Sequence, residues 1–589
     1  MKKLIALLLA MVMCFAILAA CGTPDEPAPP PVDEPTEQPT PPETPPDDYI
    51  PETPPGRKEE LGLDENRRFL EPVEITVAMW DRRNDFASDV TYNAYTEWIR
   101  EQMLELHNVI VTEFIPIFRW EEVQEMTILL AENEAPIVSY TFNFPTVDEF
   151  GRQGAIYDLA PLLEGSGDIF PYLWDFLGYA FLYNNQDQET GHIWAINGRG
   201  ALQQRYISFI REDWLAALDL PLPSTLAEFE AALYAFRDNA ELLLGADAAQ
   251  MTPLHMTDDV GWVLGPLVES FIPDAITDRE NYITAVGGDA RRFFAPGVKE
   301  AIRVVNRWFN DGLIHPDFAI ADSEEMNDRI SAGFVGAIAG HSWDQPYRGG
   351  DDGWTGQMHQ NVGPEANFIA VNTFENDAGV HRKLLGIPFD RTLFVPLNPL
   401  GNQTTQEQAV AALLYWDFLS RPETIHFLQT GFEGINHIVH PNGAIEMIMA
   451  EPGSWEVFNN PPMQYDLTMP INGLQLITPE ITLLSRALGY PGVESRLIEI
   501  AYEVQGTGIR TTWPTRTPTV SAEDGLGDTI RERGNAAWAR AIVASPEDFD
   551  AVYDAELGAL LNDFAQAAMD ERAMLWERIW GNLDMIPIN

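Results

Sequence analysis

The chain contains 589 residues, of which 90 are acidic and 36 are basic, so its formal net charge is -54. Phosphate binding needs a cationic surface, and this balance therefore argues against nucleic acid as a partner. It also disfavours a strongly anionic ligand, unless arginines cluster locally and override the overall field. With 45% hydrophobic and 11% aromatic residues, the chain has enough apolar material for a large core and enough length for two lobes.

The amino-terminal segment predicts export and a lipid anchor. Lys2 and Lys3 precede an apolar run over residues 4–18, which is too short for an ordinary membrane-spanning helix. Two alanines and then Cys21 follow this run and resemble a bacterial lipobox. We therefore expect residues 1–20 to be a lipoprotein signal peptide, and Cys21 to carry lipid such as palmitate on the extracellular face of the cell membrane. A secretory peptide cleaved elsewhere, or a short anchor helix, is the alternative.

Residues 21–60 combine the expected lipidated cysteine with a stalk rich in Pro, Glu, Asp and Thr. Proline restricts the backbone to extended forms and the acids repel one another, so we expect a semi-rigid, disordered spacer. At about 3 Å per residue, it would hold a folded domain on the order of 100 Å from the lipid. The other cysteine, Cys14, lies in the signal peptide, so the folded domain must be held by its hydrophobic core without disulfides.

Folded sequence begins near Glu71, with strands that alternate with helices. Apolar alternation predicts strands over residues 73–80, 109–114 and 136–140, and helical spacing predicts helices over 92–107 and 120–133. This order argues for parallel α/β units. Longer helices then dominate, and we expect them over residues 226–237, 296–311, 405–419 and 550–576.

Six segments in a fixed order carry a family resemblance. They are residues 154–163 (GAIYDLAPLL), 190–196 (TGHIWAI), 209–229 (FIREDWLAALDLPLPSTLAEF), 311–318 (DGLIHPDF), 333–337 (GFVGA) and 431–437 (GFEGINH). Together they resemble the extracellular solute-binding proteins of bacterial ABC importers, family 1, in the lipoprotein branch linked to carbohydrate uptake. Asp219 stands where that family usually has glycine, and His437 stands where it usually has tyrosine.

The resemblance implies a two-lobed, type II periplasmic-binding-protein-like α/β fold, rich in helix, with crossing strands between lobes that close over a ligand. We expect the N-terminal lobe to combine residues 70–200 with roughly 390–430, and the C-terminal lobe to combine roughly 201–389 with 431–589. The motifs themselves are explained as scaffold. Thr225 and Glu228 form a capping box, Trp214 is expected in the core, and Glu433 is expected to be a buried carboxylate bonded to backbone amides.

Candidate ligand contacts follow from where strands end, because open parallel sheets bind ligands at the carboxyl ends of their strands. Sugars offer apolar C–H faces to tryptophan and tyrosine, and hydroxyls to Asp, Asn, Gln and Arg. Trp80 and Asp81 end the first predicted strand, and Asn143 follows the third. Trp343 and Asp344 follow the strand that contains G-F-V-G-A. Related sugar binders often place a stacking tryptophan there, so Trp343 is the strongest single candidate.

Two further segments supply candidates of lower rank. Gln203, Arg205 and Tyr206 lie where the chain is expected to enter the second lobe, so they would either bond the ligand or orient the hinge. Trp513 lies in a loop punctuated by proline and would cover one end of the cleft.

The sequence offers little for catalysis or metal binding. It contains no G-x-S-x-G, H-E-x-x-H, Walker or G-x-G-x-x-G motif, and its ten histidines do not cluster at ligand spacing. Residues 185–191 (NQDQETG) alternate oxygen ligands like a calcium loop, but the glycine is misplaced for an EF-hand, so a hairpin turn is the better interpretation. We expect no metal and no cofactor.

These patterns predict a monomeric receptor rather than an enzyme. It would capture a small ligand and deliver it to ABC permease subunits. The aromatic residues at the strand ends favour an oligosaccharide as that ligand. An oligopeptide receptor of similar architecture is one alternative, and a sensor subunit that presents ligand to a membrane kinase is another. A surface-anchored glycan hydrolase or lyase is the alternative from another class, because two carboxylates about 5–10 Å apart would suffice for it.

Overall fold

The computed structural model describes residues 50–85, 87–187, 190–199, 206–287, 292–320, 323–348, 353–372, 374–375, 379, 381, 389–398, 401–448, 450–458, 465–471, 479–490, 492–507, 520–523 and 526–580. The chain divides into two units, residues 1–44 and residues 45–589. The predicted signal peptide, Cys21 and the stalk up to residue 49 lie outside the described residues, so the predictions for them stay predictions. The prediction that folded sequence begins near Glu71 is wrong, because a helix covers Arg57–Glu60 and the apolar side chains of Leu61, Leu63 and Phe69 are buried.

The second unit is organised around two hydrophobic cores. One core draws on residues 61–196 and 393–469, and the other draws on residues 207–374 and 497–575. The chain therefore passes from one core to the other three times, between residues 196 and 207, 374 and 393, and 469 and 497. The first core includes Phe458, Leu467 and Met469, which belong to the range expected for the C-terminal lobe. The lobe boundaries given above stay a prediction.

The first core is built from elements at two places in the chain. They are α2 (Arg57–Glu60), β1 (Val73–Asp81), α3 (Ala94–His107), β2 (Val109–Phe118), α4 (Glu122–Glu132), β3 (Ser139–Thr141), α5 (Phe144–Arg152), α6 (Ala160–Leu163), α7 (Pro171–Asn185), β4 (Ile196–Arg199), β9 (Phe389–Phe394), α17 (Gln406–Leu419) and α18 (Pro422–Thr430). A hairpin of β10 (His437–Val439) and β11 (Ile445–Met447) follows α18.

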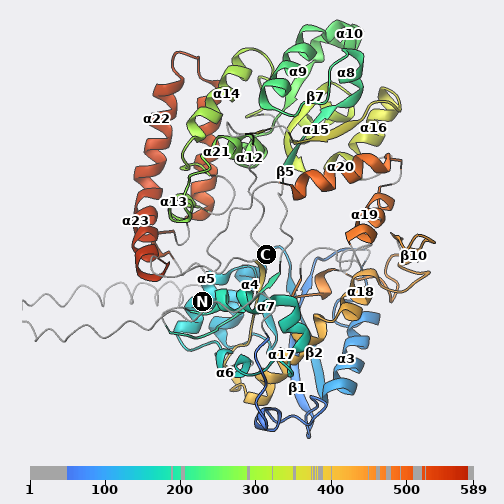
Figure 1. Cartoon of the computed structure of the whole chain (residues 1–589), viewed down its shortest axis with the longest axis vertical. Coiled ribbons are helices and arrows are strands. Elements are labelled where there is room, and N and C mark those ends of the chain that lie inside the picture. The colour runs from blue at the N-terminus through green and yellow to red at the C-terminus, as the bar shows by residue number, and fades with distance from the viewer. Residues whose placement is uncertain are drawn as a thin grey trace, which may run out of the picture. The chain divides into compact units, whose positions relative to one another are not determined.

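Strands β1 and β2 pair in parallel, as the alternation of strands and helices predicts, with Val73 opposite Val109 and Asp81 opposite Phe118 (Figure 1). A parallel bridge between Val77 and Val138 brings the chain leading into β3 beside β1. A separate antiparallel sheet has the order β3-β9-β4. The predicted strands over 73–80 and 109–114 are confirmed, whereas the third strand is shorter than predicted.

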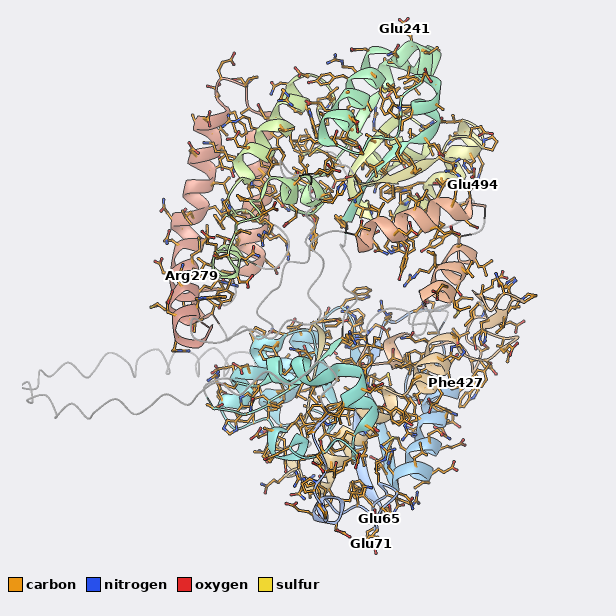
Figure 2. The ribbon with its side chains drawn as sticks, in the orientation of Figure 1. Glu65, Glu71, Glu241, Arg279, Phe427 and Glu494 are labelled. Atoms are coloured by element: carbon orange, nitrogen blue, oxygen red, sulfur yellow. The ribbon has the colours of Figure 1, made fainter. Side chains whose placement is uncertain are left out.

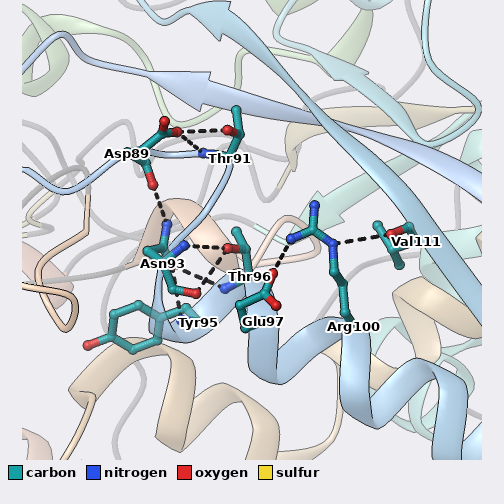
Figure 3. Close-up of polar contacts among 8 residues, drawn as sticks. All are labelled: Asp89, Thr91, Asn93, Tyr95, Thr96, Glu97, Arg100 and Val111. Carbon is teal, nitrogen blue, oxygen red and sulfur yellow. Dashed lines mark hydrogen bonds and ion pairs between the residues drawn. The ribbon is translucent and has the colours of Figure 1, made fainter.

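Helix α3 shows how the local sequence positions β2. The Asn93 side chain accepts hydrogen bonds from the backbone N of Tyr95 and of Thr96, and the Thr96 hydroxyl accepts one from the Asn93 backbone N (Figure 3). This capping box satisfies donors that the first helical turn leaves unpaired. Further along α3, Arg100 Nε donates to the Val111 carbonyl at 3.2 Å (Figure 3), which ties the helix to β2.

The second core has more helices than the first. Its elements are β5 (Tyr206–Arg211), α8 (Glu212–Ala217), α9 (Leu226–Asp238), α10 (Ala240–Leu244), β6 (Thr252–His255), α11 (Val260–Val263), α12 (Gly265–Phe271), α13 (Asp278–Thr284), α14 (Val298–Asn310), α15 (Ser323–Ser331), β7 (Val335–Ser342), α16 (Trp354–Asn361), β8 (Phe368–Val371), α19 (Pro479–Leu488), α20 (Ser495–Gly506), α21 (Gly527–Val543), α22 (Phe549–Leu560) and α23 (Gln566–Leu575).

The sheet of the second core is mixed, with the order β6-β7-β5-β8. Strands β6 and β7 are parallel, while β5 is antiparallel to both β7 and β8. Tyr206, at the start of β5, therefore lies opposite Ser342, at the end of β7. Helices α21 and α22 pack against each other and against α14 (Figure 1). The long helix predicted over 550–576 contains a π turn at Leu561–Ala565 between α22 and α23.

Residues 209–229, one of the six segments that carry the resemblance, act as scaffold. The Thr225 hydroxyl accepts a hydrogen bond from the Glu228 backbone N, and the Glu228 carboxylate accepts one from the Thr225 backbone N, so the predicted capping box opens α9. Trp214 is 3% exposed and belongs to the second core. Asp219 has a φ of 52°, in the left-handed region that favours glycine.

Exposed acids account for much of the surface charge. Glu65, Glu71 and Glu241 are exposed, and their side chains extend away from the ribbon (Figure 2). Across the described part of the chain, none of the helices combines the length and the hydropathy that a bilayer span requires.

A buried histidine gives the second core a dependence on pH. His255, in β6, is 2% exposed, and burial lowers its pKa to about 3. The unfolded chain, with a histidine pKa of about 6.5, binds more protons than the folded chain between these values. On acidification from pH 6.5 to pH 4, we expect the unfolding free energy of the unchanged protein to fall more steeply than that of His255→Gln. The difference in slope is up to about 1.4 kcal/mol per pH unit. Urea titrations at a series of pH values measure this, and parallel curves for the two proteins would contradict it.

Candidate ligand-binding site

The carboxyl ends of β1, β2 and β3 form one edge of the first core's strands. Asp81 and Phe118 end their strands opposite each other, and the Arg119 backbone N donates to the Asp81 carbonyl at 2.8 Å. Phe142 follows β3, and its ring stacks on Trp80 of β1 with 5.0 Å between centroids. Parallel sheets bind ligands outside such an edge, so the side chains here form the first candidate surface.

Two arginines and three aromatic rings meet at this edge, and we call them the first edge cluster: Trp80, Arg82, Arg119, Trp120 and Phe142. The Arg119 Cζ lies 4.4 Å from the Trp80 ring centroid, 4.6 Å from that of Phe142 and 5.2 Å from that of Trp120. The Arg82 Cζ lies 5.4 Å from the Trp120 centroid. Trp120 is 65% exposed, so much of this side chain is open to solvent beside two guanidinium groups.

Buried charges support the first edge cluster. The carboxylate of Asp466, which is fully buried, accepts from Arg82 Nε at 2.6 Å and from Arg82 Nη2 at 2.9 Å. The buried Arg391 lies with its Cζ 4.5 Å from the Trp80 centroid, and its Nη1 donates to the Thr468 carbonyl at 3.1 Å. Glu122 is 3% exposed, and burial raises its pKa. These contacts hold the rings and the guanidiniums in fixed positions.

The three candidates predicted at this edge have structural contacts. Trp80 is 1% exposed, and its backbone N donates to the Tyr140 hydroxyl at 2.9 Å, so the indole lies beneath the exposed rings. The Asp81 carboxylate accepts from the Arg83 backbone N at 2.7 Å. The Asn143 side chain accepts from the Thr146 backbone N at 3.2 Å and caps α5. Their contact with a ligand stays a prediction.

The second candidate surface lies where β7 ends and β5 begins. The half-buried Tyr206 ring lies 5.6 Å from the His341 ring and 5.4 Å from the Trp262 ring. Burial lowers the pKa of His341 to about 4, so this imidazole is neutral at neutral pH. A neutral imidazole has both a donor and an acceptor nitrogen, which suits hydroxyl groups.

Trp343 and Asp344 lie just beyond β7. The half-buried Trp343 ring is 5.8 Å from Tyr490 and 5.6 Å from Tyr502, and the Arg486 Cζ is 5.5 Å from the Trp343 centroid. The Asp344 carboxylate accepts from Arg348 Nε at 2.7 Å and from the Tyr490 hydroxyl at 3.0 Å. The structure thus brings Trp343, Asp344 and Tyr206 to one edge of the second sheet, where their role toward a ligand stays a prediction.

The remaining predicted sites divide into two groups. Gln203, Arg205 and Trp513, like Cys21, lie outside the described residues. In the loop weighed as a calcium site, the Asp187 carboxylate accepts from Arg152 Nη2 at 2.6 Å, so a cation of the protein already compensates it. Among the described residues, no group of three or more His, Cys, Asp or Glu side chains is arranged to hold a metal ion.

One expectation about a motif is wrong. Glu433 is exposed and is not the buried carboxylate that the sequence suggested. The buried Asn436 does that work instead, because its Oδ1 accepts from the Phe432 backbone N at 2.9 Å and from the Tyr95 hydroxyl at 3.1 Å. An amide meets these donors at a lower desolvation cost than a carboxylate.

Sequence reasoning missed Arg82, Arg119 and Trp120. A signal was present for Arg82, which lies two residues beyond the strand predicted over 73–80, as Phe142 lies two beyond that over 136–140. Arg119 directly follows β2, but the predicted strand stops at 114, four residues before the end of β2. The helix predicted over 120–133 includes Trp120, whereas α4 begins at Glu122 and leaves Trp120 in the turn after β2.

The known proteins to which this chain is similar are found among solved structures. No protein-family model matches the chain, and no curated protein sequence matches it. An extracellular solute-binding protein from Bifidobacterium longum subsp. infantis is 17% identical, over 85% of this chain and 98% of that chain, with a TM-score of 0.57. The alginate-binding protein AlgQ2, in a calcium-free structure, is 15% identical over 87% of this chain and 100% of that chain, with a TM-score of 0.54.

A third match has the same architecture. The ABC-transporter substrate-binding protein FusA of S. pneumoniae, in complex with kestose, is 12% identical, over 86% of this chain and 100% of that chain, with a TM-score of 0.54. At such identities the likeness shows the fold. The chain has the two-lobed, helix-rich α/β fold of solute-binding proteins, as its motifs predict.

Proposed function

We propose that this protein is a solute-binding receptor of an ABC importer that captures an oligosaccharide and delivers it to the permease. The observation that carries the proposal is that each core has aromatic rings beside hydrogen-bonding side chains at an edge of its strands, where such folds bind ligands. Trp120 offers an exposed ring in the turn after β2 of the first core, and Tyr206, His341 and Trp343 lie at the edge of the second core's sheet where β7 ends. Structural neighbours that bind kestose and alginate support the choice of a carbohydrate.

The work of such a receptor is binding and lobe closure, with no bond made or broken and no cofactor. Apolar sugar faces pack on the aromatic rings, while His341, Asp344 and the arginines of the first edge cluster bond hydroxyl groups. The ligand shifts the open–closed equilibrium by its differential affinity for the closed form, and the closed form docks on the permease. Gln203 and Arg205, from a segment between the cores, and Trp513, from a proline-punctuated loop, are proposed as further contacts.

The proposed cellular location rests on the sequence. A signal peptide over residues 1–20, a lipid on Cys21 and an acidic, proline-rich stalk would hold a monomeric receptor outside the cell membrane. Nucleic acid is not a partner in this proposal, because the net charge of -54 opposes phosphate binding.

A thermal-shift screen of the purified protein tests this function. Neutral and acidic oligosaccharides, peptides and polysaccharides are added in turn, and each mixture is analysed chemically afterwards. We expect one oligosaccharide class to raise the melting temperature and to remain intact, because a ligand that binds only the folded state stabilises it. Trp343→Ala should remove most of this shift.

The control for Trp343→Ala is Trp455→Ala. Trp455 is 41% exposed and stacks edge-on with Tyr92, and among the described residues its ring contacts neither the first edge cluster nor Trp343, so its replacement should leave the ligand-induced shift unchanged. A shift with peptides alone would establish the oligopeptide receptor instead. Cleavage of a polysaccharide would overturn the transport function and would turn attention to the carboxylates.

A further inference from the structure

Arg119 is a half-buried cation with no anionic partner. Within the part of the chain that the structure describes, no carboxylate oxygen lies within ion-pair distance of its guanidinium, and its Nε is buried without a hydrogen-bond partner. A guanidinium has five N–H donors and gains most when a planar, charged acceptor meets them. Aromatic rings partly compensate the charge but accept no strong hydrogen bond.

The surroundings hold this guanidinium in place. The Arg119 backbone N donates to the Asp81 carbonyl at 2.8 Å, which fixes the residue at the end of β1. The side chain then lies among Trp80, Phe142 and Trp120, at 4.4, 4.6 and 5.2 Å from their ring centroids. A cation that its neighbours already orient loses little conformational entropy when a ligand binds.

The buried carboxylates near Arg119 are engaged by other groups. The cations Arg82 and Arg391 share the buried Asp466, to which Arg82 forms the close, two-armed pair and Arg391 lies at 3.8 Å. Glu122 is the other buried carboxylate, and its Oε1 accepts from the Phe142 backbone N at 3.1 Å. The pKa of Arg119 is lowered most by burial and further by the charge of Arg82, while the charge of Glu122 raises it. Among the described residues, neither of these buried carboxylates forms an ion pair with Arg119.

We propose that Arg119 binds the carboxylate of a uronic acid unit, whose sugar ring packs on the exposed face of Trp120. The proposal rests on the proposed function and narrows its ligand to an acidic oligosaccharide. A sugar carboxylate is planar and accepts two parallel N–H bonds from a guanidinium, whereas a hydroxyl leaves the charge uncompensated. The 65% exposure of Trp120 gives the ring access to its platform.

The overall charge of the protein makes such a site selective. A net charge of -54 repels anions from most of the surface, so an acidic ligand is favoured only where a cation is available to pair with it. Arg119 offers such a cation at the strand edge where this fold binds ligands, because no carboxylate among the described residues pairs with it. Acidic sugars would therefore bind there in one orientation, with the carboxylate toward Arg119.

Paired ligands test the proposal. Tetrasaccharides of galacturonic, glucuronic, mannuronic and guluronic acid are each compared by calorimetry with the same tetrasaccharide after reduction of its carboxyl groups to alcohols. We expect at least one acidic form to bind about 10- to 100-fold more tightly than its reduced form, as a charge-assisted contact predicts. Arg119→Gln should abolish the preference, and Arg119→Lys should retain part of it, because lysine keeps the charge but not the planar fork.

The control is Arg83→Gln, which removes an exposed guanidinium at the same edge. Arg83 lies over Phe118, with its Cζ 3.8 Å from the ring centroid, and its replacement should leave the preference largely intact. Melting temperatures without ligand establish that the variants fold. The proposal would be overturned if every acidic tetrasaccharide bound with the same affinity as its reduced form. It would also be overturned if Arg119→Gln lowered the affinity for the acidic and the reduced form equally. Either result would leave the receptor function standing. Binding of sulfated but not carboxylated sugars would overturn the proposal as well, and binding of no oligosaccharide would overturn the function itself.

Discussion

Replacing Asp466 with alanine is expected to lower the unfolding free energy by about 3–5 kcal/mol. Asp466 is fully buried and carries the charge that neutralises Arg82, through bonds of 2.6 and 2.9 Å, and the buried Arg391. Removal of one partner from a buried pair leaves a desolvated cation, which costs more than the pair contributed. The same change loosens Arg82 beside Trp120, so it should also weaken ligand binding at the first strand edge.

Urea unfolding of Asp466→Ala, at neutral pH and constant salt, measures this loss. The second variant, Asp466→Ala with Arg82→Met, removes one cation along with the carboxylate and should recover part of the lost stability. Glu494→Ala, which breaks an exposed pair with Arg496, should change stability by less than about 1 kcal/mol. An equally small effect for Asp466→Ala would mean that water reaches the arginines and that the cluster is not desolvated.

The parts of the fold that follow local rules could be predicted from sequence. The run 73–80 is apolar at 73, 75, 77 and 79 and also at 78 and 80, which suits a strand buried on both faces, and β1 forms there with residues 75–80 all buried. Thr225 and Glu228 have the spacing of a capping box, and α9 opens at that point. The mixed direction of the second sheet is different, because β5 and β7 pair across more than a hundred residues and nothing local to either strand specifies their direction.

The candidate site was less predictable because its chemistry joins distant parts of the chain. Arg82 meets Asp466 across 384 residues, and no spacing rule connects the two. Trp80 ends its strand as predicted, but only the packed structure reveals that Phe142 and two guanidiniums cover it. Trp120 shows the limit of periodicity, since an exposed ring in a turn and the first residue of a helix look alike in sequence.

Gly297→Ala is expected to lower the unfolding free energy by roughly 3–5 kcal/mol, through two separate costs. Gly297 precedes α14 with a φ of 86°, which an L side chain adopts only with strain. A Cβ at this position would also lie 1.9 Å from the Phe271 carbonyl oxygen, at the end of α12. Because that neighbour is backbone, the start of α14 or the end of α12 must move, and both helices supply side chains to the second core.

Gly312→Ala separates the two costs, because it lies just beyond the other end of the same helix. Its φ is 75°, but nothing lies within 4 Å of the position that a Cβ would occupy. It should therefore lose only the conformational part, about 1–2 kcal/mol. Urea titrations of both variants give the difference, which measures how tightly α12 and α14 pack. If the two variants lose the same stability, the contact with Phe271 relaxes freely, and the second core is softer around α14 than its burial implies.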